Sequence, residues 1–150
     1  MVFLRSLAFN LFFYLHTIVM LFVLIPLALT SKEALMAGVR SWSRVNRWAM
    51  TAIAGVDVEL RGLDNIPAGG AIIASKHQST FETVALLDLV HAPTFVLKKE
   101  LLSIPLFGWY AKRADQIPVD RTAGRSALLD MTERARRAVR SEEHTSELQS

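Results

Sequence analysis

The most constraining feature of this chain is an uncharged stretch near its amino terminus. Residues 6–31 contain no Asp, Glu, Lys or Arg, and residues 11–25 are almost wholly apolar. These twenty-six residues, at about 1.5 Å each, give roughly 39 Å of helix, which exceeds a hydrocarbon core of about 30 Å. The stretch therefore predicts a helix that inserts into a membrane.

Two other interpretations of this stretch stay open. Arg5 precedes it and Ala28 lies near its end, as in a secretory signal peptide, although the apolar run is long for one and no clear cleavage motif follows. Pro26 would also permit a kinked helix that dips into the membrane without crossing it. Basic residues are more frequent after the stretch than before it. We therefore expect an inner (cytoplasmic) membrane protein whose remaining chain lies on the cytoplasmic side.

A second helix is predicted over residues 33–54, where apolar and basic residues mark different sides. Arginines such as Arg44 and Arg47 close to Trp42 are typical of a helix that lies in the lipid headgroup region. The alternative is a helix packed on the following domain with its arginines in solvent. We assign residues 1–54 to a membrane anchor with an interfacial helix. Because the positive charge follows an anchor, membrane phospholipids are expected as partners and nucleic acid is not.

The pattern changes after Gly55 to short apolar or alternating runs separated by helical stripes. Pro118 weakens the last of these runs as a strand or places it at a sheet edge. Strands that alternate with helices indicate an α/β fold class, with N-terminal membrane-anchoring helices followed by an αβ domain over residues 55–139. Strands are expected at residues 56–61, 71–75, 94–97 and 116–119, and helices at 80–90, 105–113 and from about 125 onward.

The last residues, 140–150, differ from the rest of the chain in composition. They show no hydrophobic period, and they match, in order, the translation of a sequencing-library adapter. We therefore expect a non-native tail at residues 140–150 and a native gene that continues differently.

The candidate for chemistry is the segment that follows the apolar run at residues 71–75. His77 lies in a polar turn, and Glu82 lies five residues later in the first turn of a predicted helix. A carboxylate that accepts from the imidazole Nδ1–H leaves Nε2 able to take a proton, which makes a dyad for activating a hydroxyl. The alternative is a capping box in which Ser79 caps the helix and Glu82 returns to the Ser79 amide.

Residues 76–82 resemble the first motif of the glycerolipid acyltransferase family, where a His is followed after four residues by Asp. Ser79 matches that pattern, and Glu82 stands where the family usually has Asp. Residues 98–108 and 117–121 resemble the second region of the family, although the match is partial. The third and fourth motifs are not present. We therefore expect a truncated chain that carries the first part of the acyltransferase domain.

The resemblance implies roles for these residues. His77 would take the proton from the acceptor hydroxyl, and Glu82 would support the imidazolium while the oxygen attacks an acyl thioester. Ser79 is expected near the substrate. Arg121 would bind the acceptor phosphate; its alternative is a surface arginine paired with Asp120 or Asp115. Lys98 and Lys99 would add phosphate or carrier contacts, or form a solvated pair.

The function implied by the resemblance is that of the bacterial lysophosphatidate acyltransferases, which serve phospholipid biosynthesis. An acyl group would pass from acyl-CoA or acyl-carrier protein to the free hydroxyl of a lysophosphatidate and give phosphatidate. The chain has no Cys and no metal-ligand motif, so neither a metal nor a cofactor is expected. Two alternatives stay open: another lysolipid acceptor, such as lyso-ornithine lipid, or a non-catalytic membrane-associated fragment.

Overall fold

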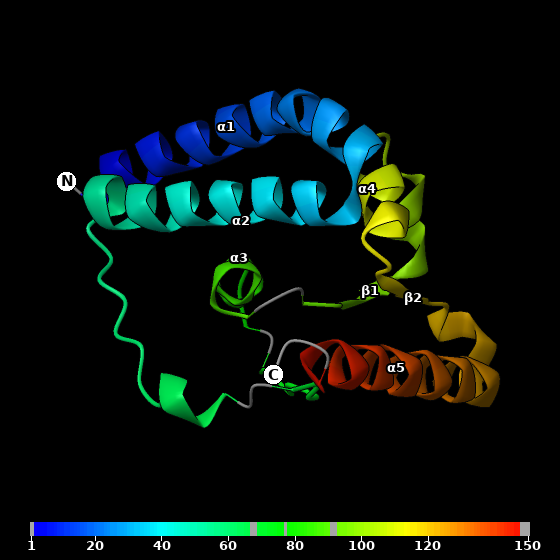
Figure 1. Ribbon diagram of the computed structural model, residues 1–150. Helices are drawn as coiled ribbons and strands as arrows, with labels where there is room; N and C mark the ends of the chain where they lie inside the picture. Colours follow the sequence, from blue (N-terminus) through cyan, green and yellow to red (C-terminus); the bar gives the residue numbers. More distant parts are fainter. Residues whose placement is uncertain (1, 67–68, 77, 91–92, 148–150) are drawn as a thin grey trace. The chain divides into compact units, whose positions relative to one another are not determined.

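The computed structural model describes residues 2–66, 69–76, 78–90 and 93–147, with backbone only at 121 and 142–147 (Figure 1). Two compact units make up the chain. The first comprises residues 1–59 and 77–93, and the second comprises residues 60–76 and 94–150.

The amino-terminal stretch forms one continuous helix, α1 (Val2–Thr30), with Pro26 inside it. In the described part of the chain, α1 is the one helix long and apolar enough to cross a membrane. Its large apolar side chains are mostly exposed; Phe3, Leu11 and Phe22 are examples, each more than 60% exposed. A water-soluble protein rarely exposes so much contiguous apolar surface, so α1 fits association with a membrane.

The second helix, α2 (Lys32–Ala49), ends in a π-helical turn, η1 (Met50–Ala54), as predicted for residues 33–54. Ser31 caps it by accepting the Ala34 N–H at 3.1 Å. α2 packs against α1, and Trp42 donates its indole N–H to the Thr17 hydroxyl at 3.1 Å (Figure 1). The Thr17 hydroxyl, which donates to the Phe13 carbonyl at 2.7 Å, thus also accepts a hydrogen bond from α2.

The third helix, α3 (Phe81–Leu89), packs on α2 and confirms the helix predicted at residues 80–90. Arg44 and Arg47 of α2 form ion pairs with Asp88 of α3. α2 therefore packs on residues that follow it, as the alternative interpretation expected, but that interpretation placed its arginines in solvent. These two arginines are paired rather than merely solvated.

The second unit contains a two-stranded parallel sheet of β1 (Val96–Lys98) and β2 (Ile117–Val119), in the register Val96 to Ile117. The crossover between them carries a 3₁₀ turn, η3 (Lys99–Ser103), and α4 (Phe107–Arg113). The strands predicted at residues 94–97 and 116–119 and the helix predicted at 105–113 are thus confirmed within a few residues. Pro118 lies at an edge, as every residue of a two-stranded sheet must.

A 3₁₀ turn, η4 (Arg121–Ala123), leads from β2 into the last helix, α5 (Gly124–Glu147). The helix predicted from about residue 125 is confirmed. Its backbone stays helical through residues 141–147, so no change in conformation marks the start of the expected tail.

The strands predicted at residues 56–61 and 71–75 are wrong. Both segments are irregular apart from the nearby 3₁₀ turn η2 (Leu63–Asn65), and Ile72 is 77% exposed. A strand is stable only when a neighbour takes up its backbone hydrogen-bonding groups. The described sheet consists of β1 and β2 alone, and neither pairs with these segments. The chain is therefore mostly helical, with a small parallel sheet.

We predict that Gly108→Ala destabilises the second unit. Helix propensity alone would favour Ala in α4 by about 1 kcal/mol. A Cβ on the buried Gly108, however, would overlap the backbone carbonyl of Leu102, and such overpacking costs about 1–3 kcal/mol. Thermal melts in detergent should show a lower Tm for Gly108→Ala and little change for Lys112→Ala, an exposed position on the same helix. A raised Tm in Gly108→Ala would contradict the close approach.

Candidate functional site

The carboxylate of Glu82 lies over the turn that starts α3. Its Oε1 accepts the backbone N–H groups of Gln78 at 2.6 Å and Ser79 at 2.8 Å, and its Oε2 accepts the Ser79 hydroxyl at 2.9 Å. The Ser79 hydroxyl oxygen in turn accepts the Phe81 N–H at 3.1 Å. Thr80 already has helical dihedral angles, so Ser79 serves as the hydrogen-bonding cap of α3.

The capping interpretation is confirmed in its main contact, because Glu82 does return to the Ser79 amide. The Ser79 oxygen also accepts the N–H of Phe81, two residues later. Glu82 therefore has a structural role at the start of α3, whatever its part in chemistry.

These hydrogen bonds lower the pKa of Glu82 to about 2. The largest cause is the backbone N–H of Ser79, and the Ser79 hydroxyl and the Gln78 N–H lower it further. Glu82 is therefore ionised at any physiological pH. The orientation of its carboxylate is fixed because several donors converge on the two oxygens.

His77, the predicted base, lies outside the described residues, so the dyad stays a prediction. Capping and support of an imidazolium are compatible at Glu82. Both roles need the same state of the side chain, an ionised carboxylate.

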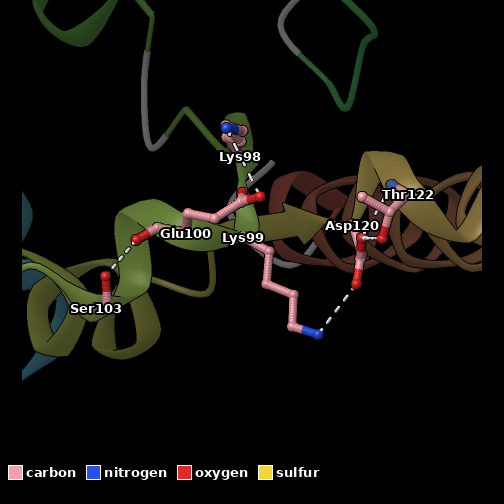
Figure 2. A network of polar contacts seen from close by, with 6 residues as sticks. All are labelled: Lys98, Lys99, Glu100, Ser103, Asp120 and Thr122. Carbon is pink, nitrogen blue, oxygen red and sulfur yellow. Dashed lines mark hydrogen bonds and ion pairs between the residues drawn. The ribbon is translucent and has the colours of Figure 1, made fainter.

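The predicted phosphate-binding lysines lie in the second unit, at the end of β1. Figure 2 shows their side chains pointing away from each other: Lys98 toward Glu100 and Lys99 toward Asp120. The N–O distances are 3.6 Å and 3.2 Å, and both lysine side chains are more than half exposed. The structure therefore does not bring the two ammonium groups to one point.

Asp120 directly follows β2 and organises this part of the second unit. Besides Lys99, it accepts the backbone N–H of Thr122 at 3.0 Å and the Thr122 hydroxyl (Figure 2). These contacts, the Thr122 hydroxyl first, lower the pKa of Asp120 to about 2. The sequence did not predict that Thr122 fixes the Asp120 carboxylate. The signal was present, since an Asp two residues before a Thr is typical of a side chain that caps a turn.

Arg121 follows Asp120 in η4, and its side chain lies outside the described residues. An open groove of about 400 Å³ lies beside this turn, between η3, β2 and α5 of the second unit. Its lining residues are Lys99, Leu102, Pro118, Val119, Asp120, Ala123, Ser126, Ala127, Asp130 and Arg134. The described side chains contain no group of three or more His, Asp or Glu placed to hold a metal ion.

Comparisons with known proteins agree with the resemblance to acyltransferases. The sequence profile of the family described as Acyltransferase matches residues 57–148. A curated Pseudomonas aeruginosa protein named 1-acyl-sn-glycerol-3-phosphate acyltransferase is 42% identical over 90 residues, which is 60% of this chain and 35% of that protein. The chain thus spans about a third of the length of this relative. No solved structure matches the chain. Since the profile covers more than half of the chain and spans the Glu82 turn, both strands and all of α5, the chain belongs to the acyltransferase family.

Proposed function

We propose that this protein transfers an acyl group from an acyl thioester to the free hydroxyl of a lysophosphatidate, giving phosphatidate. The observation that carries the proposal is the ionised Glu82 carboxylate, fixed at the start of α3 five residues after His77, in a chain of the acyltransferase family. The name of the Pseudomonas relative supports lysophosphatidate as the acceptor.

The chemistry requires a base because an alcohol is a poor nucleophile at neutral pH. His77 takes the hydroxyl proton as the oxygen attacks the thioester carbonyl, and the new C–O bond replaces the C–S bond. The imidazolium returns the proton to the leaving thiolate, and such acid–base catalysis contributes roughly 10²–10⁴-fold. With a pKa of about 2, Glu82 stays an anion throughout and stabilises the imidazolium without taking the proton itself.

Arg121 and Lys98 are the proposed contacts for the acceptor phosphate. Lys98 and Glu100 form an exposed ion pair at an N–O distance of 3.6 Å, and such a pair contributes little to stability. Lys98 can therefore leave the Glu100 carboxylate and bind a phosphate instead. Lys99 is a weaker candidate because Asp120, which also binds Thr122, holds it. Ser79 gives its one hydroxyl proton to Glu82 and could meet the substrate only as an acceptor.

The acyl donor is proposed to be acyl-CoA or acyl-carrier protein, and the location the cytoplasmic side of the inner membrane. An apolar helix with most of its surface exposed supports the membrane location. The cluster of basic residues that follows α1 supports the cytoplasmic side.

We predict that the protein sediments with membranes and that high salt does not release it. The apolar surface of α1 contributes far more to membrane binding than the basic residues of α2, whose attraction salt would screen. Fractionation followed by mass measurement of the pelleted chain tests this. Recovery of a soluble chain that begins after about residue 30 would indicate a cleaved signal peptide instead.

A turnover assay with lysophosphatidate and an acyl thioester tests the dyad in the full-length gene product. His77→Ala should lower kcat by at least about 10²-fold, and Glu82→Gln by at least about tenfold, because an amide cannot neutralise an imidazolium. Glu82→Asp should keep substantial activity. The matched control, Glu133→Gln, changes an exposed glutamate on α5 and should leave kcat unaltered.

If Glu82 only caps the helix, Glu82→Gln should have little effect on turnover, because Gln can make the same capping hydrogen bond at the third helical position. Wild-type turnover in Glu82→Gln would therefore leave Glu82 a purely structural residue. Wild-type turnover in His77→Ala would overturn the proposed function.

The pKa of Glu82 also predicts a pH-dependent stability. A carboxyl with a pKa of about 2 when folded and about 4.5 when unfolded stabilises the fold above about pH 4.5 and loses this effect as the pH falls toward 2. The difference in Tm between wild type and Glu82→Gln should thus be constant from neutral pH to about pH 5 and shrink below about pH 4. A difference that stays constant down to about pH 3 would contradict the hydrogen bonding described here.

A further inference from the structure

The helix that bears Glu82 depends on α2 for its position. α3 has nine residues, and helices shorter than about 12 residues are marginal on their own in water. Its buried residues, Val84 and Ala85, lie in the unit formed with α1 and α2. The placement of the Glu82 turn must therefore come from contacts between α2 and α3.

The first such contact is a buried hydrogen bond. The Ser43 side chain of α2 is fully buried, and its hydroxyl donates to the backbone carbonyl of Val84 in the middle of α3. A buried hydroxyl without a partner would cost stability, so this bond defines where α3 can lie against α2.

The second contact is an ion pair one helical turn away on each helix. Asp88 is largely buried, with 12% of its side chain exposed, and it forms an ion pair with Arg47 at an N–O distance of 2.8 Å. Arg44 approaches the same carboxylate at 3.5 Å but is 63% exposed, so Arg47 is the stronger partner. Two attachments, at Val84 and Asp88, prevent α3 from turning about its axis or sliding along α2.

The geometry of a helix places Glu82 away from this junction. Successive residues turn by about 100°, so Glu82 lies about 200° around the axis from Val84, on the opposite side of α3. Neither Ser43 nor Asp88 is needed for the contacts that Glu82 makes with Gln78 and Ser79. They can influence Glu82 only through the orientation of α3.

We propose that Ser43 and Asp88 are positioning residues for acyl transfer: they lock α3 so that the ionised Glu82 stays aligned with the base that precedes it. The proposal rests on the proposed function. It implies that kcat depends on two residues, one on α2 and one on α3, that take no part in the proposed chemistry themselves.

The test compares Ser43→Ala and Asp88→Asn with Trp42→Phe in the full-length gene product. Trp42 is the neighbour of Ser43 on α2, but its hydrogen bond goes to Thr17 of α1, so Trp42→Phe loosens α2 on the other side. We expect Ser43→Ala and Asp88→Asn to lower kcat about tenfold, with KM for lysophosphatidate and for the thioester changed less than about twofold. Trp42→Phe should keep the wild-type kcat at a comparable loss of Tm.

A second readout separates positioning from loss of stability. A displaced carboxylate stabilises the imidazolium less, so the acid limb of the kcat–pH profile should move to lower pH in Ser43→Ala, as in Glu82→Gln. Ser43→Ala removes one oxygen atom and adds no volume, so we expect this variant to fold. It therefore still tests the proposal if Asp88→Asn does not fold. Wild-type kcat and pH profile in a folded Ser43→Ala protein would overturn the positioning role while His77→Ala remained inactive. Activity in His77→Ala would instead overturn the proposed function itself.

Discussion

The hydrogen bond from the buried Ser43 hydroxyl to the Val84 carbonyl is the contact on which the first unit depends. It connects α2, which packs on the apolar α1, to α3, which is too short to be stable by itself. One helix thus has two different partners. Its apolar residues and Trp42 meet α1, while Ser43 and the arginine that pairs with Asp88 meet α3. A polar contact suits this second junction because a buried hydroxyl is satisfied by few geometries, whereas apolar surfaces tolerate sliding.

Each of the two units contains a carboxylate that is held in place by hydrogen bonds from nearby backbone and hydroxyl groups. Glu82 lies in the first turn of α3 and Asp120 directly follows β2, both half-buried, and both have a pKa lowered to about 2 by backbone and hydroxyl donors within a few residues. Hydrogen bonding, and not a nearby basic side chain, is the largest cause in each case. A carboxylate held by such donors keeps its charge and its orientation without being fully buried. In the proposed function, Glu82 uses this property to support a transient positive charge on His77.

The sequence predicted every described helix of five or more turns and both strands of the sheet, because each has a local pattern of its own. α1 has a long apolar run, α2 and α5 have apolar stripes, and the strands have short apolar runs. It failed at residues 56–61 and 71–75, where alternation and apolar content indicated strands. Those patterns report that a segment could lie in a sheet. Whether it does depends on a partner strand, and β1 and β2 pair only with each other. The lysines show the same limit: Lys98 and Lys99 are adjacent in sequence, yet the strand and the following turn direct them to different carboxylates.

Sequence alone determined the apolar helix α1, the helix that starts after Ser79 and the return of Glu82 to the Ser79 amide, because these features depend on residues close together in the chain. The tertiary structure alone decided that Ser43 bonds to Val84, 41 residues away, and that Lys99 pairs with Asp120, 21 residues away. The physical reason is the range of the interactions. Periodicity and capping act within a helical turn or two, so a local pattern encodes them. A contact between distant residues depends on which surfaces pack together, and many sequences with the same local pattern would pack them differently.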